Sequence, residues 1–210
     1  MSMLHKVTAA GLSILLSLVL CLNSAHADSE PETAEVLTSA QLVEALQSGG
    51  HIIYMRHSIT DHEQRDSNRN NINDCSSQRN LSTEGIKLAK LIGDKFQSLA
   101  IPVGTVMSSP YCRCKDTAEL VFGHVEINDD LRFSMSKDQH EMEMLAKKLH
   151  QMMLSSDNTK ANTVFVGHSS NLRDGLGIWP KPEGVVVIFE KVDNVIKFKG
   201  MIKPDEWTNI

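Results

Sequence analysis

Apolar and polar residues alternate along the chain in blocks whose lengths indicate strands and helices in turn. Three short apolar runs predict buried strands, at 51–55, 103–107 and 163–167. Apolar residues recur every three or four positions in four other segments, which predicts helices at 38–47, 82–99, 110–122 and 138–154. Further strands are expected at 125–127, 185–190 and 195–202, the last two joined by a turn at Asp193-Asn194.

This alternation of strands and helices predicts an α/β fold: a three-layer sandwich with a mostly parallel central sheet and helices on both faces. With 210 residues, of which 41% are hydrophobic, the chain is large enough for one substantial core. In the segment 108–122, Ser108 and Ser109 precede Pro110, which predicts a helix with a hydroxyl cap and a proline in its first turn. Ile86 is expected on the buried face of the helix at 82–99.

The N-terminus has the features of a secretory signal peptide. Lys6 precedes an apolar stretch from Val7 to Leu22, and Ala25-His26-Ala27 fits the small-x-small pattern of a cleavage site. A retained membrane anchor is the alternative, but the stretch is short for a helix that needs about 20 apolar residues. We therefore expect a signal peptide at 1–27, a domain at 28–210, and a periplasmic or secreted protein without a stable membrane anchor after cleavage.

Charge and cysteine content narrow the partners and the compartment. The formal net charge of −5 argues against nucleic acid as a partner, so any bound anion requires a local cluster of cations. Cleavage leaves three cysteines, Cys75, Cys112 and Cys114. Because the side chains of Cys112 and Cys114 diverge at a helix start, a Cys75–Cys112 disulfide is the favoured pairing, with three free thiols as the alternative.

Cationic side chains follow three of the predicted strands. Arg56 and His57 come after the first strand, Arg113 lies shortly after the second, and His168 follows the strand at 163–167. Because ligands of parallel sheets bind beyond the carboxyl ends of the strands, we expect these side chains at one edge. Like charges there repel one another, so an anion is the natural occupant, and the planar fork of arginine matches phosphate oxygens.

Four motifs in order along the chain resemble the histidine phosphatase superfamily, to which the cofactor-dependent phosphoglycerate mutases also belong. They are R-H-x-x-T (Arg56, His57 and Thr60), LSTEGIKLAKLIG at 81–93, SSPYCRCKDTAELVFG at 108–123 and VGHSSN at 166–171. The resemblance implies a phosphatase in which His57 takes the phosphoryl group while Arg56, Arg113 and His168 hold its oxygens. It also implies Thr60 as a substrate-binding residue, a small phosphorylated substrate, and no metal or other cofactor.

The chain departs from the family pattern at three positions. Ser58 stands where many members have glycine after the nucleophile. Phe133 replaces the proton-donating glutamate of the mutase-like branch, and Ser169 replaces the aspartate of the acid-phosphatase branch. Neither usual proton donor is therefore present, and the sequence does not rank the possible replacements, which are Asp61, Glu63, Asp66 and Glu183.

Other classes of protein remain as alternatives. The first is a non-catalytic phosphate or sugar-phosphate binding protein that kept the pocket and lost its acid. A zinc site made by His51, His57 and His62 has spacings that fit no paired-ligand motif, and a Cys-x5-Arg phosphatase loop is absent from the sequence. Substrate specificity is expected from the loops 61–80 and 129–141, and the sequence leaves the substrate and the oligomeric state open.

Overall fold

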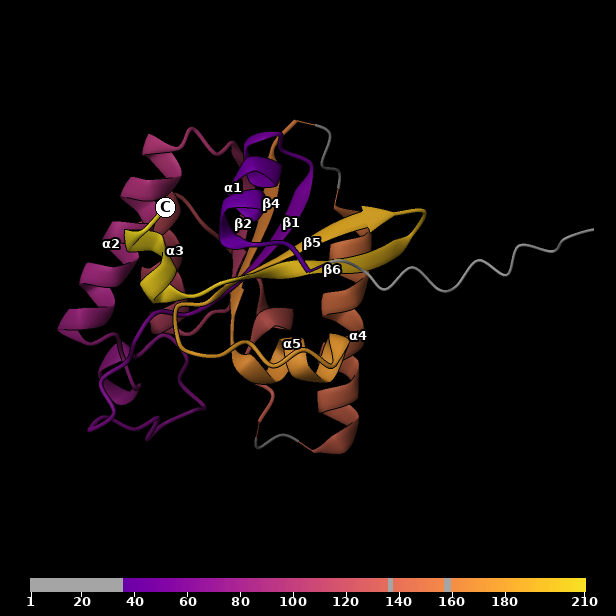
Figure 1. Cartoon of the computed structure of the whole chain (residues 1–210). Helices are drawn as coiled ribbons and strands as arrows, with labels where there is room; N and C mark the ends of the chain where they lie inside the picture. Colours follow the sequence, from indigo (N-terminus) through magenta and orange to yellow (C-terminus); the bar gives the residue numbers. More distant parts are fainter. Residues whose placement is uncertain (1–35, 136–137, 157–159) are drawn as a thin grey trace, which may run out of the picture. The chain divides into compact units, whose positions relative to one another are not determined.

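The computed structural model describes residues 36–135, 138–156 and 160–210, so the predicted signal peptide lies outside the described residues. A central sheet organises this part of the chain (Figure 1). Its strands are β1 (His51–Arg56), β2 (Val103–Ser108), β3 (Glu126–Ile127), β4 (Asn162–Gly167), β5 (Val186–Val192) and β6 (Val195–Ile202). Their order across the sheet is β3-β2-β4-β1-β5-β6.

Parallel pairing brings the carboxyl ends of three neighbouring strands to one edge of the sheet. β4 lies between β1 and β2 and pairs with both in parallel, with Arg56 opposite Gly167 and Ser108 opposite Val166. β2 and β3 are also parallel, whereas β5 runs antiparallel to both β1 and β6. The residues that directly follow β1, β2 and β4 therefore leave the sheet side by side.

Five α-helices of the described chain cover the two faces of the sheet (Figure 1). They are α1 (Ser39–Gln47), α2 (Thr83–Ser98), α3 (Cys112–Phe122), α4 (Gln139–Ser155) and α5 (Ser169–Leu176). α1, α2 and α3 share one core cluster that includes Ile53 of β1, while α4 and α5 share another that includes Ile52. Adjacent strand residues point to opposite faces, so β1 is buried on both sides. The predicted three-layer α/β sandwich is confirmed.

Several local predictions were wrong. The helix expected from Pro110 begins at Cys112, and its N-cap residue Tyr111 makes no side-chain cap hydrogen bond. The Ser109 hydroxyl instead lies 2.9 Å from His168 Nε2, so a tertiary contact has replaced the local cap. Ile86, expected inside, is 40% exposed.

Short helices were the elements that the sequence pattern did not reveal. α5 contains serine, asparagine, aspartate and glycine, and its helical form depends on burying Leu172 against the core that it shares with α4. Three 3-10 helices also occur in the described chain, η1 (Cys75–Ser77), η2 (Asp129–Leu131) and η3 (Pro204–Thr208). Such segments are too short for a periodic pattern, and packing decides them.

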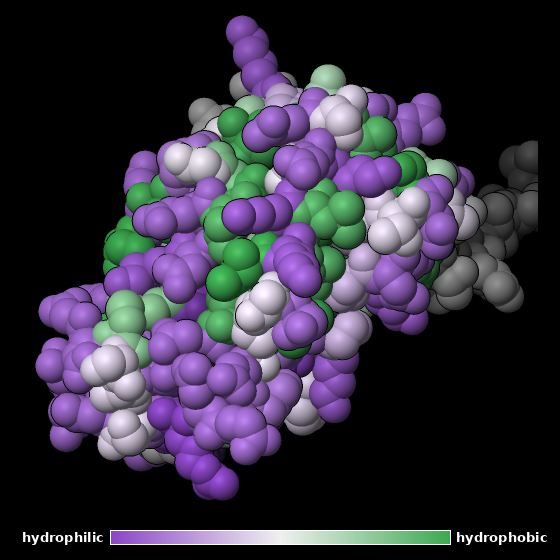
Figure 2. All heavy atoms as spheres, turned by 90° about the vertical axis from the view of Figure 1, so that its left-hand side faces the viewer, coloured by the Kyte–Doolittle hydropathy of each residue, from purple (hydrophilic) through white to green (hydrophobic). Residues whose placement is uncertain are grey.

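The long polar segment 61–80 forms an ordered loop at the lower left of Figure 1. Figure 2 views the molecule from the α2 side, where apolar residues gather in the middle of the face and hydrophilic residues fill its lower part. No helix among the described residues is long and apolar enough to cross a lipid bilayer.

The start of α2 packs directly against the segment that follows β1. A Cβ atom added at Gly85 would collide with the backbone carbonyl of Ile59, and the Ser58 hydroxyl donates a hydrogen bond to the Gly85 carbonyl at 2.8 Å. Glycine at position 85 thus lets α2 lie against residues 58–60 and fix their path. This contact orients the segment that carries His57.

We expect Gly85→Ala to lower the free energy of unfolding by about 1–3 kcal/mol, because the added methyl group overpacks a backbone contact. Urea denaturation measures the change. Gly104→Ala is the matched control, since the nearest atom to its added Cβ would be the Ala161 methyl group at 3.3 Å. An equal loss in both variants would contradict the role given to the contact at Ile59.

Candidate active site

His57, the first residue after β1, is a buried imidazole with one ring nitrogen available for chemistry. Its side chain is 2% exposed, and Nδ1 donates a hydrogen bond to the Ser58 carbonyl at 2.9 Å. A proton on Nδ1 leaves the lone pair of the neutral ring on Nε2. Burial, and then the charge of Arg113, lower the pKa of His57 well below its usual value. The ring is therefore neutral at neutral pH.

His168 lies beside His57 because β1 and β4 pair in parallel. The two ring centroids are 5.5 Å apart, and His168 is 1% exposed. The rings of Tyr111 and Phe133 each lie 5.1 Å from the His168 ring and hold it in place. Burial and the neighbouring Arg113 charge lower the pKa of His168 as well. The two predicted histidines thus form one buried pair.

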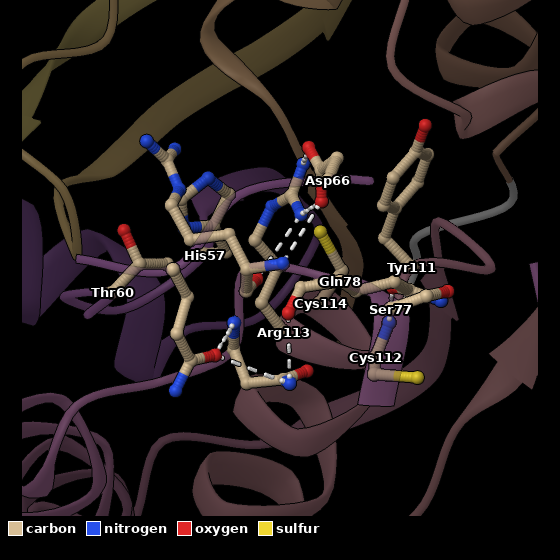
Figure 3. A network of polar contacts seen from close by, with 12 residues as sticks. His57, Thr60, Asp66, Ser77, Gln78, Tyr111, Cys112, Arg113 and Cys114 are labelled. Carbon is tan, nitrogen blue, oxygen red and sulfur yellow. Dashed lines mark hydrogen bonds and ion pairs between the residues drawn. The ribbon is translucent and has the colours of Figure 1, made fainter. Parts of the chain in front are cut away.

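Arg113, in the first turn of α3, is a buried cation held by residues of the loop 61–80 (Figure 3). Its Nη1 donates to Asp66 Oδ1 at 2.9 Å and to the Arg79 carbonyl at 3.2 Å. The guanidinium carbon lies 4.5 Å from the centre of the Tyr111 ring, which adds a cation–π contact. These contacts fix the guanidinium on the side of the site formed by α3.

Glu183 organises the other side of the site. It accepts hydrogen bonds from Arg56 Nη2 at 3.1 Å and from the Thr60 backbone N–H at 2.9 Å, and the Thr60 hydroxyl also donates to it. Arg79 Nη2 and His62 Nε2 lie 3.6 and 3.7 Å from the same carboxylate. Thr60 is therefore placed as a partner of Glu183, and its predicted contact with substrate stays a prediction.

Three arginines have buried hydrogen-bond donors without a partner among the described residues. The Nε atoms of Arg56, Arg79 and Arg113 are all in this position. The same three side chains lie close enough to His57 for their charges to lower its pKa. Buried polar groups are normally satisfied, so these donors fit an anionic ligand with several oxygens.

Arg79 is the site residue that sequence reasoning missed. It lies in the loop 61–80, outside the strand-end positions that predicted the other cations. Its carbonyl contacts Arg113 and its side chain contacts Glu183, so it links the two sides of the site. Among several arginines in a polar loop, no periodicity or spacing distinguishes it from a solvated cation.

Three of the four candidate proton donors accept hydrogen bonds in the structure. Asp66 and Glu183 accept hydrogen bonds from Arg113 and Arg56 respectively. Asp61 accepts from the Glu63 N–H and from Gln64, on the exposed loop. Each of these three carboxylates thus serves as a hydrogen-bond acceptor in the structure.

The structure separates His51 from His57, two of the three histidines of the zinc alternative. His51 begins β1 and His57 follows its end, which places their backbones on the order of 20 Å apart. Within the part of the chain that the structure describes, no group of three or more His, Cys, Asp or Glu side chains is arranged to hold a metal ion.

The predicted Cys75–Cys112 disulfide is confirmed and ties the loop 61–80 to the start of α3. Next to it, Gln78 Oε1 accepts a hydrogen bond from the Cys112 N–H at 2.9 Å. Cys114 is free and buried, with Sγ 3.6 Å from His168 Nε2. Burial raises the pKa of the Cys114 thiol to about 12, so it stays neutral beside the imidazole.

Comparison with known families agrees with this geometry. The model of the histidine phosphatase superfamily (branch 1) matches residues 52–169, which is more than half of the chain. The chain therefore belongs to the histidine phosphatase superfamily, as the four sequence motifs predicted. This membership places it among phosphatases that use a histidine nucleophile. A comparison with curated proteins found no match.

Solved structures share the fold at low sequence identity. The protein histidine phosphatase SixA complexed with tungstate matches with a TM-score of 0.53 and 13% identity, over 74% of this chain and 98% of SixA. A phosphoserine phosphatase from Entamoeba histolytica in complex with 3-phosphoglyceric acid matches with a TM-score of 0.55 and 14% identity, over 73% of this chain and 96% of that protein. The alpha-ribazole phosphatase from Shigella flexneri matches with a TM-score of 0.52 and 14% identity, over 73% of this chain and 96% of that protein. The shared core of the fold thus extends over nearly the whole of each neighbour.

We expect Cys75→Ala to lower the free energy of unfolding by about 2–4 kcal/mol, because the disulfide restricts the unfolded chain. The same change should weaken tungstate binding, since Asp66 and Arg79 belong to the tethered loop. Thermal unfolding and calorimetric titration with tungstate measure the two effects.

Reductant provides the control for this prediction. Reduction should lower the stability and the tungstate affinity of the wild type to the values of the variant. It should leave both quantities unchanged in Cys75→Ala. Tungstate affinity that is the same in the oxidised wild type and in the variant would show that the tether does not position the site.

Proposed function

We propose that the chain hydrolyses small phosphate monoesters through a phosphohistidine intermediate on His57. One observation carries the proposal: a neutral buried imidazole that donates from Nδ1 lies near three arginines whose buried Nε donors have no partner among the described residues. The structural neighbours support a phosphorylated ligand, since SixA is complexed with tungstate and the phosphoserine phosphatase with 3-phosphoglyceric acid. The reaction needs no metal if the arginines stabilise the phosphoryl charge.

In the first step, His57 Nε2 attacks phosphorus and the bond to the leaving oxygen breaks, with the bonding electrons departing on that oxygen. Arg56 and Arg113 hold the non-bridging oxygens, and His168 lies within reach of the same group. In the second step, water attacks phosphorus, the P–N bond returns its electrons to Nε2, and a proton leaves to solvent. This step releases inorganic phosphate and restores the free imidazole.

Glu183 and Asp66 keep the arginines in place before substrate arrives. Each carboxylate compensates part of the local positive charge, which reduces the cost of gathering guanidinium groups in a buried site. A phosphoryl group then competes with these carboxylates for the guanidinium donors. The predicted roles of Arg56, Arg113, His168 and Thr60 in binding substrate are part of this proposal.

A second candidate function is non-catalytic binding of a phosphate or sugar phosphate. Phe133 and Ser169, at the positions of the family's usual acids, are the observation that favours it. The pocket would be the same in both cases. Formation of a covalent intermediate distinguishes the catalytic function from the non-catalytic one.

We also propose that residues 1–27 act as a signal peptide and that residues 28–210 form the exported domain. The Cys75–Cys112 disulfide supports this proposal, because such bonds persist in oxidising compartments. A periplasmic or secreted location without a stable membrane anchor follows from cleavage after Ala27.

We expect His57→Ala to reduce kcat below detection while tungstate still binds, because the imidazole is needed to form the intermediate and the arginines remain. Rapid quenching with a ³²P-labelled ester should trap acid-labile label on the wild type. His140→Ala, an exposed histidine at the start of α4, is the control and should behave as the wild type. Turnover in His57→Ala, or binding without labelling in the wild type, would exclude the covalent mechanism.

The second expectation concerns the leaving group. Without a positioned acid, the departing oxygen leaves as an anion, and general acid catalysis is worth about 10² to 10⁴ in rate. We therefore expect kcat/KM to fall steeply across a series of phosphate esters as the pKa of the leaving group rises. Aryl phosphates should be hydrolysed much faster than simple sugar phosphates.

A flat dependence on leaving-group pKa would show that a donor exists. Glu63→Gln is the variant to examine in that case, because Asp61, Asp66 and Glu183 already accept hydrogen bonds. A dependence that becomes steep only in this variant would identify Glu63 as the donor.

A further inference from the structure

Tyr54 is a buried residue of β1 that the proposed mechanism does not use. Its side chain lies in the core cluster that α4 and α5 share, and its hydroxyl donates a hydrogen bond to the backbone carbonyl of His168 at 2.7 Å. Burial raises the pKa of Tyr54 well above its usual value, so the hydroxyl stays a donor. A phenylalanine would fill the same space without a polar group to satisfy, so packing alone does not account for the hydroxyl.

Gly167, the last residue of β4, leaves room for this hydroxyl. A Cβ atom added at Gly167 would collide with the hydroxyl oxygen of Tyr54. The register pairs Tyr54 with Phe165, so the tyrosine side chain extends along β4 toward its carboxyl end before it meets His168. Tyr54 and Gly167 therefore fit one another at the point where β4 ends.

The hydrogen bond from Tyr54 holds the backbone end of His168. The imidazole end is held separately, since Nε2 lies 2.9 Å from the Ser109 hydroxyl. His168 leads directly from β4 into α5, and its side chain makes no cap hydrogen bond to that helix. Because the side chain has only two torsions between these two contacts, the place of the ring follows the place of the backbone.

The place of the His168 ring matters for the proposed chemistry. The ring centroid lies 5.5 Å from that of His57, and both imidazoles face one phosphoryl group in the proposed mechanism. Misplacing a reacting or binding group by about 1 Å can cost about 10²-fold in rate. Tyr54 ties His168 to the buried core, and this support does not depend on the loop 61–80 that holds Arg113.

We propose that Tyr54 is a positioning residue, whose hydroxyl sets the place of His168 relative to the phosphoryl group. The inference rests on the proposed function, and it adds a residue of the core to the support of the site. Tyr54 acts through His168, because its hydroxyl contacts the backbone of that residue.

Tyr54→Phe tests the proposal, since it removes the hydroxyl and keeps the ring. We expect kcat/KM for phenyl phosphate to fall about tenfold, the effect of losing one hydrogen bond that holds a binding group in place. The affinity for tungstate should fall as well, because tungstate occupies the place of the phosphoryl group. Steady-state kinetics and calorimetric titration measure the two effects.

His168→Ala separates positioning from a purely structural role. In the His168→Ala background, Tyr54→Phe should change neither kcat/KM nor tungstate affinity any further, because the group that it positions is gone. The free energy of unfolding should instead fall equally in both backgrounds, since the backbone carbonyl of residue 168 remains. A tenfold loss from Tyr54→Phe that persists without the imidazole would overturn the proposal.

Ile52→Val is the matched control. Ile52 lies two residues before Tyr54 on β1, is fully buried and packs in the same core cluster. The variant should lower stability by leaving a small cavity, without removing a polar contact. It should leave kcat/KM and tungstate affinity of the folded protein unchanged. A loss equal to that of Tyr54→Phe would show that the site responds to core stability in general, and would overturn the role of the hydroxyl.

Failure of the proposed function is a separate outcome. If the wild type hydrolyses no ester and forms no phosphohistidine, the catalytic proposal fails, and calorimetry with tungstate still tests the role of Tyr54. Weaker tungstate binding in Tyr54→Phe that disappears in the His168→Ala background supports that role. Equal tungstate affinity in the wild type and in Tyr54→Phe would overturn it.

Discussion

The parallel pairing of β1 with β4 is the constraint on which the site depends. This register places Arg56 opposite Gly167, so the next residue of each strand is a histidine, and the two imidazoles leave the sheet side by side. A shift of one residue would turn the side chains of a strand to the opposite faces and move buried residues out of their cores. Because both faces of β1 are buried, the hydrophobic cores hold the register and thereby hold the histidine pair.

Gathering cations at this edge has an energetic cost that the surrounding structure offsets. The arginines repel one another and lose part of their hydration, and Asp66 and Glu183 compensate both effects with ion pairs. The aromatic rings of Tyr111 and Phe133 contribute further contacts to Arg113 and exclude water from His168. Burial and, after it, the charge of Arg113 lower the pKa of His57, so the arginines that favour an anion also help to keep this imidazole neutral.

The loop 61–80 shows how a surface segment becomes part of a buried site. A polar loop of this length has little core of its own, and here a disulfide, an ion pair and a side-chain cap to the start of α3 replace that core. These connections bring Arg79 between Arg113 and Glu183. The ends of β1 and β4 and the first turn of α3 supply the two histidines and two of the arginines, whereas this loop supplies Asp66 and Arg79.

The sequence by itself determined the sheet and the long helices, because buried parallel strands and amphipathic helices leave strong periodic patterns. It also identified His57, His168, Arg56 and Arg113 as neighbours, since chain order and parallel pairing place strand ends at one edge. It did not find α5 or the true start of α3, where Leu172 and the Ser109–His168 contact outweigh local preferences. Only the tertiary structure assigned Glu183 to Arg56 and Thr60, and Arg79 to the site. Those contacts join segments more than a hundred residues apart or lie in an aperiodic loop, and no local pattern records them.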